Sequence, residues 1–349
     1  MTKSIKSQVD DEEFKAKRKQ ANLLLDTGKF EEALPEYQKL IEINPDYAEG
    51  YCNIGLIQIE QNRLAEAEKN LMISIQKDPE LLEGYYNLGL LYQRKGSFAK
   101  ALIFYKEVVT RNKQDSDTFL QMGFCALSMN NKTDARAFFQ ESFRQRPNSL
   151  EAGAALASIL IEFNLYEDAE EVLRISLISY PEEISLHFSL GMVLRQQNKP
   201  EQALAHFKRV VSLDENHAQG FYYLADCCFQ LDLLDQAESF FAIAYKLNQS
   251  SAEIVLQLGK VYEKQKKMDK LIVAQQQWVE MVKAQLWQLD PESQDQFNTI
   301  CQNLIDYYAR ESDINKTVYY QSLMSGHDSF DLQSKTEPDD YNISLLIDD

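Results

Sequence analysis

The sequence predicts an all-α solenoid of antiparallel helix pairs, and three regularities of the chain support this fold class. A period of 34 residues runs without insertion or deletion from Phe14 to Gln285 and gives eight repeats. The eighth position of every repeat is Gly or Ala, and the twentieth is Ala in the first seven. Large side chains at positions 7 and 24 keep helical spacing to these small residues.

Each repeat is predicted to hold a first helix, A, and a second helix, B. A glycine inside a helix costs about 1 kcal/mol relative to alanine, so its return at position 8 indicates that helix B approaches closely. Residues 1–13 precede the array as an N-terminal extension. The eight repeats are 14–47, 48–81, 82–115, 116–149, 150–183, 184–217, 218–251 and 252–285.

Residues that favour turns separate the predicted helices. Glycine or asparagine near position 15 is expected to form the turn between helices A and B. Proline at position 32 of four repeats is expected at the start of the next helix, where the missing N–H costs nothing. The turn residues are Gly28, Asn62, Gly96, Asn130, Asn164 and Asn198, and the prolines are Pro45, Pro79, Pro147 and Pro181.

Two more helices are predicted after the array. From Met268 the helical pattern runs on to Trp287, longer than an ordinary B helix. Asp290, Pro291 and Glu292 form a typical helix start, with a cap, a proline and an acid in the first turn. We interpret residues 286–325 as capping helices, with a degenerate ninth repeat as the alternative. The apolar stripe of the first of them is Phe297, Ile300, Cys301, Leu304, Ile305 and Tyr308.

Residues 326–349 are predicted to be an acidic, disordered tail. Seven acids and one lysine give this segment a net charge of -6, too polar to bury a core. The apolar stretch from Tyr341 to Ile347 is either a docking motif, an occupant of the chain's own groove, or part of an inert solubilising tail.

The repeat resembles the tetratricopeptide repeat family, whose 34-residue unit carries an aromatic residue, Leu-Gly, Tyr, Ala, an aromatic residue and Pro. The resemblance covers 272 of 349 residues and implies a right-handed superhelix with a concave groove lined mainly by the A helices. The first repeat (Lys17, Gln20) and the eighth (Leu271, Gln275) depart from the pattern, as terminal repeats often do. The third repeat shows the signature best, with Tyr85, Leu88, Gly89, Tyr92, Gly96, Ala101 and Tyr105.

Composition argues against several functional classes. The 36 basic and 54 acidic residues give a formal net charge of -18, which repels nucleic acids and anionic membranes. No apolar run is long enough to insert in a membrane and the start of the chain has no signal sequence, so we expect a cytoplasmic protein. Five scattered cysteines are expected to be reduced core thiols. No catalytic constellation, metal motif or cofactor motif is found, so we expect no enzyme, metal or cofactor.

The resemblance implies that positions 2, 5, 6, 9, 12 and 13 of helix A face the groove. Position 6 carries Asn53, Asn87 and Gln121 in consecutive repeats, and such carboxamides can pair with an extended peptide backbone. They are therefore candidate rungs of a peptide-binding ladder, or solvated polar residues without a function. Acids recur at position 2 (Glu49, Glu83, among others), which favours neutral or basic ligand segments.

Apolar side chains at other A-helix positions are candidates for partner contact, because exposed clusters of this kind mark interaction sites. The alternative is that neighbouring helices cover them, which would make them core residues. These candidates are Phe124, Phe188, Met192, Tyr222, Tyr223 and Phe229.

Two readings of function follow. The first is a non-enzymatic scaffold or adaptor whose groove binds extended peptide segments of partner proteins. The second is the substrate-selecting subunit of an enzyme complex, as in some glycosyl transfer, with the catalytic part on another chain. A chaperone-tail adaptor is a further alternative, since Arg18, Asn22 and Asn53 fall on the first three places of the carboxylate clamp of such adaptors, with Arg in place of Lys. Glu83, at a later place, would repel the carboxylate. Self-association through the array ends also remains open.

Overall fold

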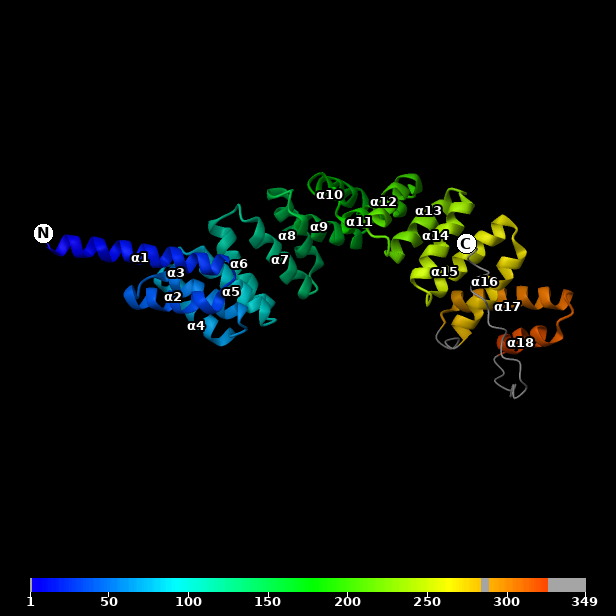
Figure 1. Ribbon diagram of the computed structural model, residues 1–349, viewed down its shortest axis with the longest axis horizontal. Coiled ribbons are helices and arrows are strands. Elements are labelled where there is room, and N and C mark those ends of the chain that lie inside the picture. The colour runs from blue at the N-terminus through cyan, green and yellow to red at the C-terminus, as the bar shows by residue number, and fades with distance from the viewer. Residues whose placement is uncertain (1, 284–288, 326–349) are drawn as a thin grey trace. The chain divides into compact units, whose positions relative to one another are not determined.

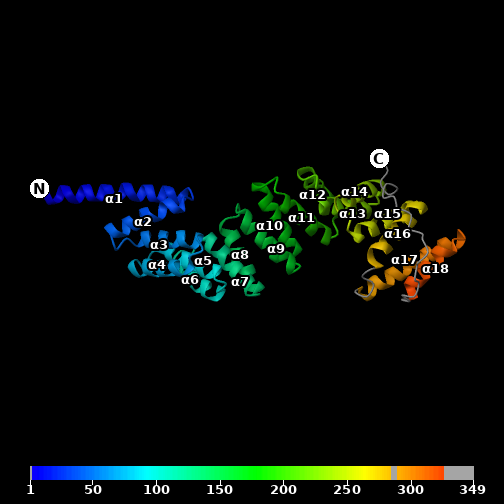
Figure 2. The same cartoon turned by 60° about the horizontal axis from the view of Figure 1, so that its bottom comes forward.

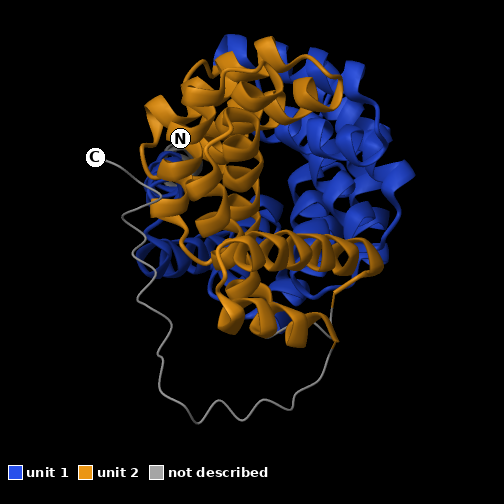
Figure 3. Cartoon of the chain, turned by 90° about the vertical axis from the view of Figure 1, so that its right-hand side faces the viewer, with its two compact units in different colours: residues 1–179 blue, residues 180–349 orange. Residues whose placement is uncertain are grey.

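The computed structural model describes residues 2–283 and 289–325, and every regular element within these ranges is a helix. The chain divides into two compact units, residues 1–179 and 180–349 (Figure 3). The first unit contains ten helices and the second contains eight among the described residues (Figure 1). The predicted all-α fold of helix pairs is therefore confirmed in each unit.

The helices of the first unit alternate between B and A helices after a long first helix. In Figures 1 and 2 the N-terminal part of α1 runs past the end of α2. The bounds are α1 Thr2–Asp26, α2 Phe30–Ile43, α3 Ala48–Glu60, α4 Leu64–Lys77, α5 Leu82–Arg94, α6 Phe98–Arg111, α7 Ser116–Ser128, α8 Lys132–Gln145, α9 Leu150–Glu162 and α10 Tyr166–Ser179.

The second unit continues the alternation and ends in one further helix pair. From α3 to α15 every A helix begins 34 residues after the previous one, and from α2 to α16 the B helices do the same. Within each unit, consecutive helices pack on one another. The bounds are α11 Ile184–Gln196, α12 Pro200–Leu213, α13 Ala218–Gln230, α14 Leu234–Leu247, α15 Ala252–Gln265, α16 Met268–Val282, α17 Pro291–Arg310 and α18 Ile314–Ser325.

The small and large residues of the repeat form the contact between helices A and B. Alanine at position 20 is fully buried in each of the first seven repeats. The side chain at position 24 is at most 1% exposed in the same seven repeats and is Tyr, Phe or Leu. It lies directly over position 8, so that a Cβ added at Gly191 would come within 2.8 Å of the Phe207 ring.

The turns between helices A and B share one backbone geometry. Position 15 has a left-handed conformation in all eight repeats, which confirms the six predicted Gly and Asn residues. Asp232 and Lys266 adopt it too, at φ of 60°, although their residue types did not indicate a turn. In each turn the next residue donates its N–H to the carbonyl oxygen five residues earlier, as in a Schellman motif. The turn between α17 and α18 repeats this geometry at Ser312.

Two details of the predicted helix boundaries were wrong. The prolines at position 32 lie in a turn before helix A: Pro45 is the second residue of a turn closed by the Tyr47 N–H on the Asn44 carbonyl, where a fixed φ is favoured. Helix α16 ends at Val282, so it has the length of an ordinary B helix. Trp287 and residues 326–349 lie outside the described ranges.

The predicted start and apolar stripe of α17 are confirmed. Asp290 caps the helix through its side chain on the Ser293 N–H, and Pro291 is the first helical residue. The buried residues of α17 are the six predicted ones. The division into eight repeats and a capping pair remains our proposal for the domain organisation.

The contact at position 8 predicts opposite effects for one substitution at two sites. Gly123→Ala places a Cβ into the Phe139 ring, so we expect a lower unfolding midpoint, with overpacking costing about 1–3 kcal/mol. At Gly259 the nearest atom, Leu271 Cδ1, lies 3.8 Å from the added Cβ. Gly259→Ala should therefore raise the free energy of unfolding by about 1 kcal/mol through helix propensity, and with it the midpoint. Urea denaturation followed by circular dichroism checks this, and equal shifts would contradict it.

The strained turn at Lys266 predicts a second stability effect. A left-handed non-glycine residue costs about 1–2 kcal/mol, so Lys266→Gly should increase the free energy of unfolding. Lys260→Gly, on an exposed position inside α15, is the matched control and should decrease it by about 1 kcal/mol. A destabilised Lys266→Gly protein in the same denaturation assay would contradict this account.

Candidate functional site

The four predicted carboxamides of the first unit lie on A helices or on α1, but their amides pair within the chain. The Tyr37 hydroxyl donates to Asn22 Oδ1 at 2.6 Å and also interacts with the Asn53 amide. Burial raises the pKa of Tyr37 to about 12, and the bond with Asn53 offsets part of that shift. Asn22 is exposed and Asn53 is half-buried, so these two amides keep a solvent-facing side.

Asn87 and Gln121 are tied to neighbouring helices. Asn87 is only 7% exposed, and its Nδ2 donates to Cys52 Sγ at 3.3 Å. Gln121 Oε1 accepts from Gln93 Nε2 at 3.2 Å, while Gln93 Oε1 accepts from the Tyr105 hydroxyl at 2.9 Å. The three position-6 amides therefore differ in accessibility: Asn53 and Gln121 are partly open, whereas Asn87 is covered.

Three of the predicted aromatic residues come together in the second unit. The ring of Phe188 on α11 packs edge-on against Tyr223 on α13, with centroids 5.7 Å apart. Tyr223 also stacks on Phe207, and its neighbour Tyr222 packs edge-on against Phe241. All three predicted rings are half-buried, so one part packs in the array and another part faces solvent. We name Phe188, Tyr222 and Tyr223 the aromatic row.

Charged side chains hold the aromatic row in place. Arg195 lies over the Tyr223 ring at 5.4 Å and donates through Nε to Asp226 Oδ2 at 2.6 Å. The Tyr222 hydroxyl donates to Glu253 Oε1 at 3.1 Å. Burial, followed by the negative charge of Glu253, raises the pKa of Tyr222. Tyr222 therefore stays protonated and acts as a hydrogen-bond donor at neutral pH.

The remaining apolar candidates are not part of the aromatic row. Phe229 at the C-terminal end of α13 is half-buried beneath Lys264, whose Nζ lies 4.3 Å from the ring centroid. Met192 on α11 is half-buried. Phe124 on α7, in the first unit, packs edge-on against Phe139.

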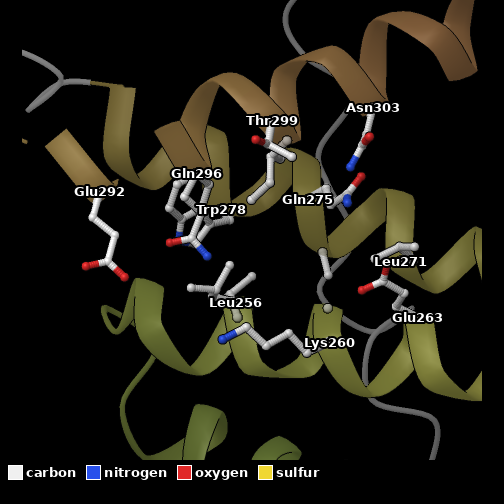
Figure 4. A pocket seen from close by; sticks show the side chains of 14 residues that line it. Leu256, Lys260, Glu263, Leu271, Gln275, Trp278, Glu292, Gln296, Thr299 and Asn303 are labelled. Carbon is white, nitrogen blue, oxygen red and sulfur yellow. The ribbon is translucent and has the colours of Figure 1, made fainter. Parts of the chain in front are cut away.

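A cleft that the sequence analysis did not predict lies between α15, α16 and α17. It has a volume of about 410 Å³, and Figure 4 shows side chains from all three helices around it. Its apolar wall includes Leu256, Leu271 and Trp278, and its polar wall includes Gln275 and Gln296. The signal was present in the sequence: the eighth repeat keeps Gly259 at position 8 but has Gln275, not an aromatic residue, at position 24.

Two kinds of comparison with known proteins bear on this arrangement. Family models described as TPR repeat or Tetratricopeptide repeat match residues 21–62, 48–79, 82–115, 117–149 and 188–252. Together these matches span more than half of the chain, in both units. The chain belongs to the tetratricopeptide repeat family. No curated protein matches the sequence.

Several solved tetratricopeptide repeat structures are similar to the chain. YrrB, described as a TPR protein with an unusual peptide-binding site, is 21% identical and covers 51% of this chain and 91% of its own, with a TM-score of 0.47. MamA from Desulfovibrio magneticus RS-1 is 22% identical, covers 49% and 97%, and has a TM-score of 0.44. A repeat protein from Parabacteroides merdae is 18% identical, covers 71% and 98%, and has a TM-score of 0.45.

Tetratricopeptide repeat arrays are typically non-catalytic scaffolds for protein interaction, and two histidines of this array pair with each other. His187 and His206 lie with their Nδ1 atoms 3.0 Å apart, and the other nitrogen of His187 lies 3.0 Å from the Pro181 carbonyl oxygen. Among the described residues no three potential metal ligands cluster. Within the same ranges, no helix combines the length and the apolar character that a membrane span requires.

The buried cysteines of this tetratricopeptide repeat chain predict low thiol reactivity. Burial raises the pKa of Cys52, Cys227 and Cys301 to about 12 and of Cys125 to about 11, and Cys228 is raised as well. Because the thiolate is the nucleophile, Ellman's reagent at pH 8 should label less than one thiol per native chain and all five in guanidinium chloride. Rapid labelling of one native cysteine would contradict the structure.

Proposed function

We propose that the chain is a non-enzymatic interaction scaffold that holds extended segments of partner proteins against the A helices of its repeats. The family supports the general role, since tetratricopeptide repeats serve protein interaction. The observation that carries the more specific proposal is the aromatic row, whose rings lie on consecutive A helices and stay partly exposed.

A partly exposed ring that is already fixed in position favours binding. Phe188 and Tyr223 are held by neighbouring rings, so a partner that covers them removes apolar surface from water and orders few additional side chains. Aromatic residues in such settings often dominate binding energy. The aromatic row is therefore our proposed main contact, with Met192 beside it on α11 and Phe229 near the end of α13.

The charge of the A helices favours a neutral or basic partner segment. Acids stand at position 2 of five A helices: Glu49, Glu83, Asp117, Glu151 and Glu253. Asp117 is paired with Arg146 at 2.7 Å, but none of the ion pairs among the described residues includes Glu83 or Glu151. An acidic segment would meet uncompensated carboxylates there and a chain of net charge -18.

The first unit contributes a second, weaker set of contacts in this proposal. Asn22, Asn53 and Gln121 keep part of their amides open, and Phe124 is half-buried on the same helix as Gln121. Asn87 is the least suited of the predicted ladder because its amide is covered. The last two places of the carboxylate-clamp alternative fall on Glu83 and Asn87, so the burial of Asn87 on Cys52 also argues against a clamp.

A charge substitution beside the aromatic row tests the proposal. Met192→Lys adds a positive charge on a half-exposed A-helix position and should weaken binding of basic peptides about tenfold. The matched control is Ile178→Lys, which makes the same change at an 80% exposed position of B helix α10. The full-length protein and both variants are immobilised and panned against a random dodecapeptide phage library, and selected peptides are titrated by isothermal calorimetry.

The outcomes separate the proposal from non-specific adhesion. Peptides rich in apolar and basic residues that bind the parent and the Ile178→Lys protein, and lose affinity for Met192→Lys, would support it. Selection of acidic peptides, or equal affinity for all three proteins, would contradict the assignment to the aromatic row. No selected peptides at all would contradict peptide binding by this scaffold.

A further inference from the structure

We propose that the cleft between α15, α16 and α17 is a specificity pocket of the scaffold, which binds an apolar side chain followed by a lysine or arginine of an extended partner segment. This inference rests on the proposed function and names a second binding site, separate from the aromatic row. Figure 4 shows the cleft with its lining side chains.

The cleft exists because the eighth repeat lacks the side chain that covers position 8 elsewhere. In the sixth repeat the Phe207 ring occupies this space, within 2.8 Å of a Cβ added at Gly191. In the eighth repeat the corresponding residue is Gln275, and an added Cβ at Gly259 meets only Leu271 and Ala274, at 3.8 and 3.9 Å. The space of an aromatic ring is thus left open over the backbone of α15.

The floor of the cleft suits an apolar side chain. Trp278 is 5% exposed and Leu271 is 7% exposed, so both are fixed in the core and turn one face to the cleft. Leu256 and Ile300 complete this wall from α15 and α17. An aliphatic side chain of a ligand would bury its surface here without any rearrangement of the helices.

The cleft also has a polar wall, formed by amide side chains of α16 and α17. Gln275 Oε1 is buried and has no hydrogen-bond partner among the described residues. Gln296 and Asn303 of α17 lie on the same cleft, and their amides can pair with the backbone of an extended segment.

The charges around the cleft select a cationic donor. Glu263 and Glu292 both line it, and neither has an ion-pair partner within residues 2–283 and 289–325. In Figure 4, Glu263 lies at the same end as Gln275 and Asn303, whereas Glu292 lies at the other end and Lys260 points away from Glu263. A lysine or arginine beside the apolar residue can therefore pair with the exposed Glu263 carboxylate and neutralise its charge.

The same charges argue against the chain's own acidic end as the occupant. The apolar stretch from Tyr341 to Ile347 has no basic residue and is flanked by Asp340 and Asp348. Its carboxylates would lie near Glu263 and Glu292 and raise the energy of the complex. A peptide of residues 338–349 is therefore the comparison ligand in the test.

The test uses the full-length protein and defined peptides. The probe is acetyl-Gly-Ser-Leu-Lys-Ser-Gly-amide, with analogues that replace Leu by Ala or Lys by Glu. Trp287→Phe leaves Trp278 as the only tryptophan, so its fluorescence reports occupation of the cleft. Anisotropy of the fluorophore-labelled probe reports binding anywhere on the chain. We expect both signals to saturate together, and each analogue to bind at least tenfold more weakly.

Two substitutions test the pocket against matched controls. Glu263→Lys, at an exposed position, should weaken the Lys probe at least tenfold and strengthen the Glu analogue, whereas Glu31→Lys, an exposed glutamate of α2, should do neither. Gln275→Phe fills the cleft with the ring found in the sixth and seventh repeats and should abolish binding. Gln38→Phe on α2 is its control.

The outcomes distinguish a failure of the pocket proposal from a failure of the general scaffold proposal. The pocket would be established if Gln275→Phe abolishes both signals and Glu263→Lys reverses the preference between the Lys probe and the Glu analogue. An anisotropy change that persists in Gln275→Phe, or that occurs without a Trp278 response, would overturn the pocket and leave the scaffold proposal standing. Tighter binding of the 338–349 peptide would overturn the choice of ligand. Absence of binding by every peptide here, with phage-selected peptides still bound, would also overturn the pocket alone.

Discussion

The close approach of helix A and helix B is the contact on which each repeat depends. Alanine at position 20 is fully buried in seven repeats, and the large side chain at position 24 covers position 8. Because this contact recurs every 34 residues, the helices start at that interval and each pair presents an equivalent apolar surface to the next. The left-handed backbone conformation at position 15 forms the turn that reverses the chain direction between the two helices. Different residue types adopt it.

One candidate site lies where the large side chain at position 24 covers position 8, and the other lies where this side chain is missing. In the sixth and seventh repeats the covering rings of Phe207 and Phe241 also support Phe188, Tyr222 and Tyr223, so the core packing fixes the aromatic row. In the eighth repeat the covering ring is absent and α17 closes the space from the other side, which leaves a cleft. The proposed binding surface therefore consists of side chains that also pack against the core.

The same packing decides which polar groups are paired within the chain. The hydroxyls of buried tyrosines at position 24 need partners, and they find them in A-helix amides: Tyr37 in Asn22 and Tyr105 in Gln93. Amides that satisfy the core are less available to a ligand, which limits the predicted ladder. Gln275 is the opposite case, since its Oε1 is buried without a hydrogen-bond partner among the described residues.

The sequence by itself determined the helices, their 34-residue spacing, six of the eight turn residues and the cap and apolar stripe of α17. These features depend on residues close together in the chain, so a periodic pattern reveals them. It also identified all three side chains of the aromatic row. Only the tertiary structure decided that Asn87 is covered while Asn53 stays open, and that Gln275 faces a cleft. Both outcomes depend on which other helix lies over the side chain, and identical positions in a repeat differ in that respect because their neighbours carry different residues.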